Sequence, residues 1–99
     1  MRAGFTPEAV ADLEGIMAYL EPLNPAAAKR VVEAIQRSVI VICENPRIGH
    51  RTDVEGILEF IEPRYRYKLP YIIRRDIIIV LRVYHPSCAP IDYAALSKL

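Results

Sequence analysis

Basic and aromatic side chains are concentrated in one part of the sequence. Residues 64–75 contain five Lys/Arg residues and no Asp or Glu, with tyrosines interleaved among them. The last long apolar run then ends in a string that includes Arg82, Tyr84 and His85. Cleavage of RNA without a metal needs such groups: a base or acid for the 2′-hydroxyl and cations for the phosphate. The same cations, gathered on one face, would equally bind an acidic partner without any chemistry.

The net charge of +1 conceals an uneven distribution. Residues 1–63 contain six Lys/Arg and ten Asp/Glu, whereas residues 76–99 contain two of each. Side chains alternate along a strand, so a strand over the basic stretch would have one cationic face and one apolar and aromatic face. The cationic face comprises Arg64, Arg66, Lys68 and Arg74, and the opposite face comprises Tyr65, Tyr67, Leu69, Tyr71 and Ile73. We predict a cationic groove on the sheet; the alternative is a basic face that is merely solvated.

Other common catalytic motifs are missing from the sequence. The four glycines are scattered, so there is no glycine-rich phosphate loop. The two cysteines and two histidines form no local pair with metal-ligand spacing, and we expect no metal and no cofactor. Ser87 lies two residues after His85, but a proline separates them and no acid is near to orient the imidazole. We therefore expect no serine nucleophile.

Two helices are predicted in the first half of this 99-residue chain, which is long enough for a single domain over residues 1–99. Thr6-Pro7 and Asn24-Pro25 each combine a capping residue with a proline suited to the first helical position. Apolar residues then recur at helical spacing until Pro22 ends the first helix and Asn45-Pro46 ends the second. The short connection predicts an antiparallel helical hairpin.

Strands are predicted in the second half, over residues 57–61, 67–74 and 77–84, and a short strand before Thr6 would be a fourth. Pro70 cannot donate to a ladder, so its strand has either a free edge or a bulge there. Arg75-Asp76 leaves room for a tight turn, without the glycine that such turns favour. Residues 77–81 are apolar on both faces, which indicates a strand covered on both sides, or on one side by a partner. The predicted fold is α+β, an N-terminal antiparallel helical hairpin packed on an antiparallel sheet of three or four strands.

A resemblance to a known family rests on four segments. The chain contains, in order, Phe5-Thr6-Pro7-Glu8-Ala9, Asn45-Pro46-Arg47-Ile48-Gly49-His50, Tyr67-Lys68-Leu69-Pro70-Tyr71 and Val80-Leu81-Arg82-Val83-Tyr84-His85. In this order and spacing, over residues 3–87, they resemble the RelE/ParE superfamily of type II toxin–antitoxin toxins. The resemblance implies a helical hairpin on an antiparallel sheet, which agrees with the fold predicted from periodicity.

The resemblance leaves two activities open. ParE-like members poison DNA gyrase, and RelE-like members cleave mRNA in the ribosome with basic residues and a His or Tyr near the end of the sheet. The string Val80–His85 is similar to the ParE-like form, and the net charge of +1 departs from the more basic RelE-like nucleases. We therefore expect a ParE-like toxin that inhibits gyrase by binding, with no catalytic residue of its own. A metal-independent, ribosome-dependent mRNA interferase is the alternative, and an inactive member that only binds a partner is a third possibility.

The resemblance also implies candidate site residues and a partner. The target-binding residues would be Arg64, Arg66, Lys68, Arg74, Arg82 and His85, and in a nuclease Arg82, Tyr84 and His85 would be catalytic. The family implies a cognate antitoxin, whose disordered segment folds on the toxin as it binds. We expect antitoxin anchors at Leu13, Met17, Tyr19 and Leu20, although the same positions are candidates for the core.

The two ends of the sequence carry the remaining expectations. The N-terminus lacks the apolar segment of a signal peptide, and no apolar run is long enough for a membrane span. Together with two unpatterned cysteines, this indicates a cytoplasmic protein with no membrane partner. Residues 89–99 depart from the family pattern, because Pro86 and Pro90 prevent the last strand from continuing and residues 91–96 favour a short helix.

Overall fold

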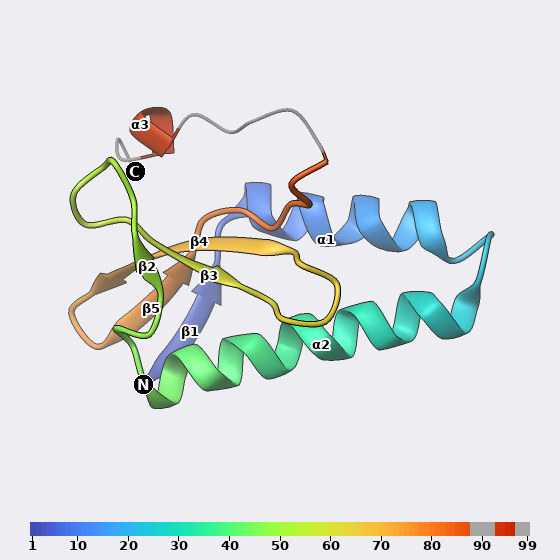
Figure 1. Ribbon diagram of the computed structural model, residues 1–99, viewed down its shortest axis with the longest axis horizontal. Helices are drawn as coiled ribbons and strands as arrows, with labels where there is room; N and C mark the ends of the chain where they lie inside the picture. The colour runs from blue at the N-terminus through green and yellow to red at the C-terminus, as the bar shows by residue number, and fades with distance from the viewer. Residues whose placement is uncertain (88–92, 97–99) are drawn as a thin grey trace.

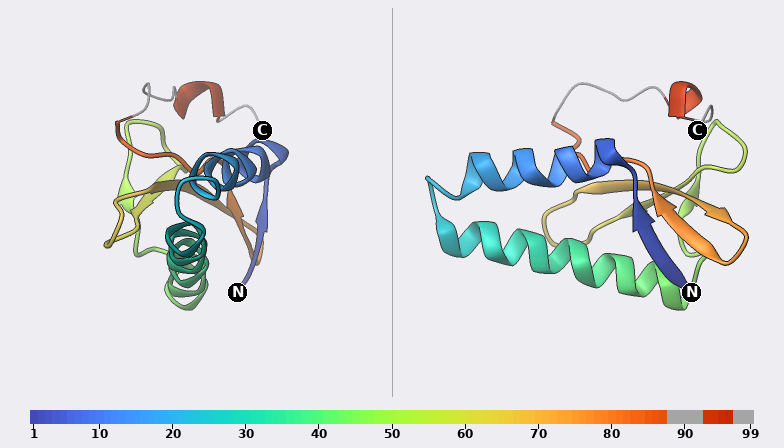
Figure 2. Two further views of the ribbon diagram at one scale, coloured as in Figure 1. Left: turned by 90° about the vertical axis from the view of Figure 1, so that its right-hand side faces the viewer. Right: turned by 180° about the vertical axis from the view of Figure 1, so that it is seen from behind.

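Two long helices and a sheet form the two layers of the molecule (Figure 1). The computed structural model describes residues 1–87 and 93–96. The elements are β1 (Arg2–Phe5), α1 (Pro7–Leu20), α2 (Pro25–Glu44), β2 (His50–Arg51), β3 (Leu58–Ile61), β4 (Lys68–Arg74), β5 (Ile77–Val80) and α3 (Tyr93–Leu96). Figure 2 shows α1 and α2 side by side along their length, as an antiparallel hairpin. The predicted α+β fold is confirmed.

Both long helices begin and end where the sequence predicts. The hydroxyl of Thr6 accepts a hydrogen bond from the N–H of Ala9 at 3.1 Å, and it donates to the carbonyl of Leu81 at 2.7 Å. The side chain of Asn24 accepts from the N–H of Ala27 at 3.1 Å. Each cap satisfies a main-chain donor that the first helical turn leaves unpaired. Thr6 in addition ties the start of α1 to the end of the sheet.

The sheet has five strands in the order β1-β5-β4-β3-β2, which is more than the three or four predicted. The three predicted strands form its centre, and every pair among β2, β3, β4 and β5 is antiparallel. β1 pairs with β5 in parallel, so the sheet is mixed. β2 escaped prediction because two residues are too few to show the alternation of a strand.

Pro70 lies in the interior of the sheet, where β4 pairs with a strand on each side. The free edge is therefore ruled out, and the predicted bulge is confirmed. Tyr71 pairs with Val80 and Lys68 pairs with Tyr84, so two residues of β4 lie opposite three of the last strand and its continuation. The N–H of Leu81 donates to the carbonyl of Pro70 at 2.8 Å, which shows that the side of Pro70 without a donor faces this bulge.

The turn between β4 and β5 consists of Arg75 and Asp76, as predicted. Arg75 takes a φ of 58°, in the left-handed region where glycine is normally favoured. A non-glycine residue there costs about 1 kcal/mol relative to an unstrained conformation. The tight connection is thus formed despite its sequence, because pairing on both sides fixes the two strands.

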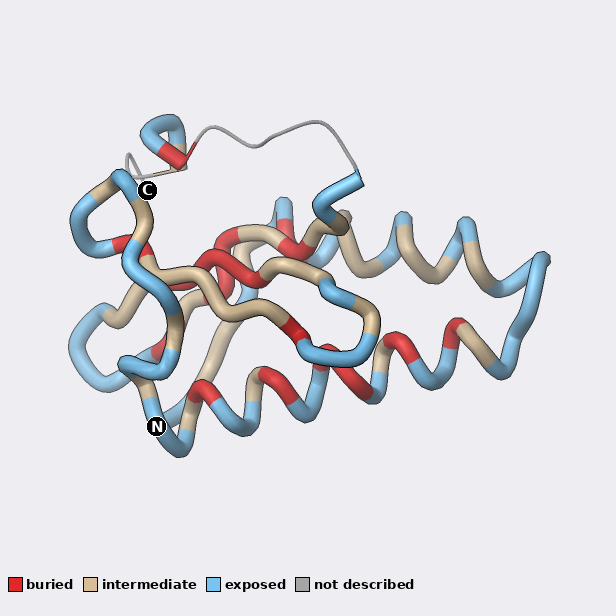
Figure 3. The backbone as a smooth tube through the Cα atoms, in the orientation of Figure 1, coloured by how far each residue is buried: buried red, intermediate tan, exposed pale blue. Residues whose placement is uncertain are grey.

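Apolar side chains pack on both faces of the sheet. Figure 3 shows where the buried residues lie along the strands and helices. The main core lies between the helices and the sheet and includes Ile35, Ile42, Leu69, Tyr71, Ile78 and Val80, all nearly inaccessible to solvent. A smaller core on the other face contains Ile57, Leu81 and Tyr93, with Ile72 and Ile79 packed against it. The prediction that residues 77–81 are covered on both sides is confirmed for residues 78–81, whereas Ile77 is 36% exposed. The second cover is α3, which realises the predicted C-terminal helix over 93–96, whereas residues 91 and 92 lie outside the described residues.

None of the helices in the described ranges is long and apolar enough to cross a membrane.

Candidate functional site

The five basic residues of the 64–75 stretch do not share one face of a strand. Arg64 and Arg66 lie in the loop between β3 and β4, because β4 begins only at Lys68. Arg74 is the last residue of β4 and therefore lies at the other end of that strand. The prediction of a continuous cationic face is wrong. Only Lys68 lies beside the predicted residues of the last strand, through two main-chain hydrogen bonds with Tyr84.

Glu62 explains why the strand does not extend through Arg64 and Arg66. Its carboxylate is buried and accepts the main-chain N–H groups of Arg64 at 2.7 Å and Tyr65 at 2.6 Å. Its carbonyl accepts the N–H of Arg66 at 3.0 Å, and Arg66 has a φ of 70°. These bonds replace ladder pairing and hold a compact turn. The turn leaves both arginines exposed, with the guanidinium of Arg64 5.4 Å from the ring centroid of Tyr65.

Arg82 forms a two-pronged ion pair with Asp12 of α1. Nε lies 2.7 Å from one carboxylate oxygen and Nη2 lies 2.9 Å from the other. The first oxygen also accepts the main-chain N–H of Val83 at 2.9 Å. The hydrogen bonds that Arg82 donates to the carboxylate of Asp12 raise the pKa of Arg82 above its usual value. The predicted target-binding cation is therefore already paired, and it joins α1 to the continuation of β5.

Lys68 is joined to α3 through Glu59, and Tyr84 contacts Tyr93 of α3 directly. Nζ of Lys68 lies 3.7 Å from one oxygen of Glu59, and the hydroxyl of Tyr93 donates to the other. The hydroxyls of Tyr84 and Tyr93 lie 2.6 Å apart. Burial of the phenol, followed by its hydrogen bond to Glu59, raises the pKa of Tyr93 far above its ordinary value. The hydroxyl of Tyr84 is thus occupied within the fold.

His85 lies at the same end of the sheet and packs against the aromatic ring of Tyr67. The two ring centroids are 5.4 Å apart with the planes at 77°, an edge-to-face contact. Nδ1 of His85 accepts the main-chain N–H of Ser87 at 3.2 Å and lies 2.8 Å from the hydroxyl of Ser87. Because a main-chain N–H can only donate, Nδ1 is the acceptor and the neutral ring has its proton on Nε2. Lys68, Tyr84 and His85 therefore lie at one end of the sheet, and each is held by neighbours.

The four candidate antitoxin anchors differ in exposure. Tyr19 is 71% exposed, whereas Leu13, Met17 and Leu20 are half-buried. Leu13 and Leu20 pack against the main core, which supports the alternative that they are core positions. Other apolar side chains of this helix and the turn after it are also exposed, Val10 by 43% and Leu23 by 69%. In α1 only Ala9 is fully buried, so much of this helix is open to a partner.

The loop between α2 and β2 is fastened to β4 by Tyr71. The buried Tyr71 hydroxyl donates to the carbonyl of Pro46 at 2.7 Å and accepts the N–H of Gly49 at 3.0 Å. Burial raises the pKa of this phenol. A Cβ on Gly49 would lie 2.8 Å from Tyr71 atoms, so the close approach requires glycine. The segment Asn45–His50, noted in the sequence for the end of the second helix and for its family resemblance, therefore also fastens this loop to the sheet.

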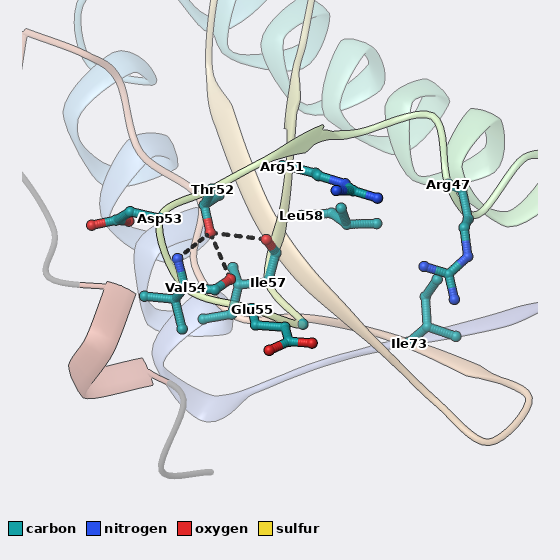
Figure 4. Close-up of a pocket in the computed structure, with 10 residues that line it drawn as sticks. Arg47, Arg51, Thr52, Asp53, Val54, Glu55, Ile57, Leu58 and Ile73 are labelled. Atoms are coloured by element: carbon teal, nitrogen blue, oxygen red, sulfur yellow. Dashed lines mark hydrogen bonds between the residues drawn. The ribbon is translucent and has the colours of Figure 1, made fainter.

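A cleft of about 560 Å³ opens beside this loop (Figure 4). Arg47 and Arg51 line one side, and Leu58 and Ile73 contribute apolar surface. Within residues 1–87 and 93–96, neither arginine has an ion-pair partner. Sequence reasoning missed both, because they are isolated in the sequence and belong to the half of the chain with net negative charge. It also missed Asp12, although an acid beside the apolar stripe of α1 was a signal for a partner on the sheet.

The described part of the chain contains no group of three or more His, Cys, Asp or Glu residues placed to hold a metal.

Comparison with known proteins decides the family. The family model described as "ParE toxin of type II toxin-antitoxin system, parDE" matches residues 4–88. The chain belongs to the ParE toxin family. The protein named "Putative toxin Y4kP" from Sinorhizobium fredii is 36% identical over 79 residues, which are 80% of this chain and 82% of that protein. The predicted ParE-like branch is confirmed.

The fold of this ParE toxin also matches a solved structure. A chain from the chromosomal ParDE toxin–antitoxin system of P. aeruginosa superposes with a TM-score of 0.75 and 25% sequence identity. The match covers 86% of this chain and 95% of that one. The residues that match the family model include the ion pair of Asp12 and Arg82 and the loop Asn45–His50, and they end before α3.

Proposed function

We propose that this ParE toxin inhibits DNA gyrase by binding to it and that a cognate antitoxin neutralises the toxin. Family membership supports a type II toxin, and the pairing of the predicted nuclease residues favours binding over RNA cleavage. Arg82 is paired with Asp12, Lys68 with Glu59, and the hydroxyl of Tyr84 with Tyr93. Stabilising a phosphorane-like charge requires cations aimed at the substrate, and these cations are instead aimed at carboxylates.

The exposed residues near this end of the sheet support contact with a protein target. Arg64 and Arg66 are exposed on the turn that Glu62 holds, and Tyr67, the residue after Arg66, packs against the half-buried ring of His85. Arginines displayed on a fixed turn are suited to hydrogen bonding and ion pairing across an interface. Of the six predicted target-binding residues, we therefore give the leading roles to these three. Arg74 lies at the far end of β4 and would belong to a different contact.

The exposed surface of α1 supports a role in antitoxin binding. Val10, Tyr19 and Leu23 expose apolar side chains on or just after this helix. An antitoxin segment that folds on the toxin would bury them, and an exposed tyrosine is a common anchor in such interfaces. Tyr19→Ala should weaken the toxin–antitoxin complex by about tenfold or more, as judged by titration calorimetry. Glu14→Ala, at an exposed position of the same helix, is the control.

A supercoiling assay with purified gyrase tests the proposal. The toxin should block supercoiling and accumulate cleavage complexes, and stoichiometric antitoxin should restore activity. Replacing Arg64 and Arg66 together by alanine should weaken inhibition, whereas Arg30→Ala on the exposed face of α2 should not. Absence of any effect on gyrase, together with growth arrest on induction, would reject the gyrase proposal.

The mRNA interferase alternative has a separate test. Programmed ribosomes incubated with the toxin should yield intact mRNA if the proposal is correct. Cleavage that is lost in His85→Ala or Arg82→Ala would establish the interferase instead. Absence of growth arrest on induction without antitoxin would favour the third possibility, an inactive member that acts only through its partner.

A further inference from the structure

We propose that the cleft beside Arg47 and Arg51 binds an extended peptide segment that carries carboxylates and pairs with the open part of β4. Residues of the loop between β2 and β3 line this cleft. Figure 1 shows this loop at the opposite end of the molecule from the turn between α1 and α2. It is therefore separate from the exposed end of α1 that contains Tyr19. The proposal goes beyond gyrase and antitoxin binding and does not depend on either.

The sheet has a step at the cleft. β3 begins at Leu58, which pairs with Tyr71, whereas β4 continues to Arg74. Beyond Tyr71, β4 pairs with β5 on one side, and no residue of a described strand lies opposite it on the other. The chain turns away before β3, where the N–H of Ile57 donates to the carbonyl of Val54 at 3.2 Å and Gly56 has a φ of 89°.

Ile73 is the residue of β4 whose main chain faces this step. Lys68 and Pro70 direct their main-chain groups toward the continuation of β5, as their hydrogen bonds to Tyr84 and Leu81 show. Direction alternates along a strand, so the N–H and carbonyl of Ile73 point to the other side, where β3 has not begun. Ile73 also lines the cleft. An unpaired edge of this kind is a template for an added strand.

Arg47 and Arg51 supply the charge for such a segment. They come from two parts of the chain and line the same cleft, and neither has an ion-pair partner within the described residues (Figure 4). Two cations at one hollow repel each other unless an anion lies between them, and a carboxylate matches the guanidinium fork. The two hydrogen bonds of the Tyr71 hydroxyl fix the loop that carries Arg47. Binding therefore costs little conformational entropy in this loop.

The composition of the cleft favours a peptide over a nucleic acid. Asp53 and Glu55 also belong to its lining, and Figure 4 shows Asp53 directed away from the two arginines. The closely spaced phosphates of a nucleic acid would be repelled by these two carboxylates. A peptide can place a carboxylate at the arginines and apolar side chains elsewhere. Leu58 and Ile73 provide the apolar surface that such side chains need.

A synthetic peptide provides the test. The probe is an acetylated, amidated hexapeptide of alternating valine and glutamate, titrated into the full chain while amide chemical shifts are followed by NMR. We expect saturable binding with shifts centred on Ile73, Leu58 and Arg51. Arg47→Glu and Arg51→Glu should each weaken binding by about tenfold or more, because each loses a charge-assisted contact and gains a repulsive one.

Matched controls test the recognition of carboxylates and the pairing with β4 separately. Arg30→Glu, on the exposed face of α2, should leave the affinity unchanged, and a valine–lysine peptide should not bind. N-methylation of the peptide at every second residue should abolish binding in one register and spare it in the other, because only one set of N–H groups would pair with Ile73. No saturable binding, equal binding of the lysine peptide, or full affinity in both arginine variants would overturn the proposal. Binding of a short single-stranded oligonucleotide at the cleft in preference to the peptide would also overturn it.

Discussion

The two regions that concentrate cations in this toxin differ in how those cations are balanced. At one end of the sheet, Arg82 and Lys68 each contact a carboxylate, from Asp12 and Glu59 respectively. Beside the loop after α2, the arginines at 47 and 51 line a cleft and have no ion pair within the described residues. The first region includes Lys68 of the basic stretch 64–75, and the second lies in the acidic half of the sequence. Local charge density in a sequence therefore does not tell where an unbalanced cation will be, because the partner can be 70 positions away.

The largest effect is expected when the ion pair between Asp12 and Arg82 is broken. Asp12→Ala removes both contacts to Arg82 and the acceptor for the N–H of Val83, leaving partly buried donors unsatisfied. We expect a loss of about 2–3 kcal/mol in the free energy of unfolding, measured with urea. Asp12→Asn retains an oxygen for Val83 and should cost less than Asp12→Ala. Glu14→Ala is the control, and a loss no larger than its effect would contradict the structural role of the pair.

The next largest effect is expected when the hydroxyl of Tyr71, which holds the loop that carries Arg47, is removed. Tyr71→Phe leaves the carbonyl of Pro46 and the N–H of Gly49 without their partner. We expect a loss of about 1–2 kcal/mol in unfolding free energy, and faster hydrogen exchange in residues 46–51 than in the wild type. Tyr19→Phe, at an exposed position, removes a hydroxyl without either effect. Unchanged exchange in the loop would show that Tyr71 does not hold it.

A third effect concerns alkaline pH at the paired end. The pKa of Tyr93 is raised in the folded state, so the folded state retains this proton when the unfolded chain begins to lose it near pH 10. The resulting stability is fully present below about pH 10 and is lost as the pH rises further. Tyr93→Phe has no proton to release on unfolding, so its stability should fall less steeply above pH 10 in a series of denaturant titrations. Equal slopes for the two proteins would contradict the burial of the Tyr93 phenol and its hydrogen bond to Glu59.

The smallest effect is expected at Arg75, a cation that belongs to neither region. Arg75 has a positive φ in the β4–β5 turn and is exposed. Arg75→Gly should stabilise the fold by about 0.5–1 kcal/mol, because glycine accepts this conformation without strain. Inhibition of gyrase and binding of the valine–glutamate peptide should not change. A loss of stability would mean that the arginine side chain itself holds the turn.

Elements with strong local signals were predictable from the sequence. The caps at Thr6 and Asn24, the ends of both helices and the bulge option at Pro70 depend on chemistry within a few residues. β2 and the parallel pairing of β1 were not: β2 has no periodicity to detect, and the parallel pairing of β1 depends on where the last strand lies. The assumed alternation through Arg64 and Arg66 failed because one buried carboxylate, Glu62, captures main-chain N–H groups and replaces a strand with a turn.

The candidate site was predictable only in part, because several of its contacts join elements that are distant in the chain. The sequence predicted that Arg82, Tyr84 and His85 would extend the basic face of the neighbouring strand, and of that face only Lys68 pairs with this segment, opposite Tyr84. It could not show that Asp12 and Tyr93 would engage their neighbours, since both contacts form between elements distant in the chain. Tyr93 also lies beyond the region that the family shares, so a family pattern offers no signal for it.

The difference between the two regions can be measured directly through the arginine side chains. In ¹⁵N NMR spectra, the Nε–H of Arg82 should exchange slowly with solvent because it donates to Asp12, and the protection should weaken in Asp12→Asn. The Nε–H groups of Arg47 and Arg51 should exchange at the rate of a free side chain until the valine–glutamate peptide is added, and then become protected. Arg82 exchanging as fast as Arg47, or Arg47 and Arg51 already protected in the free toxin, would contradict the account.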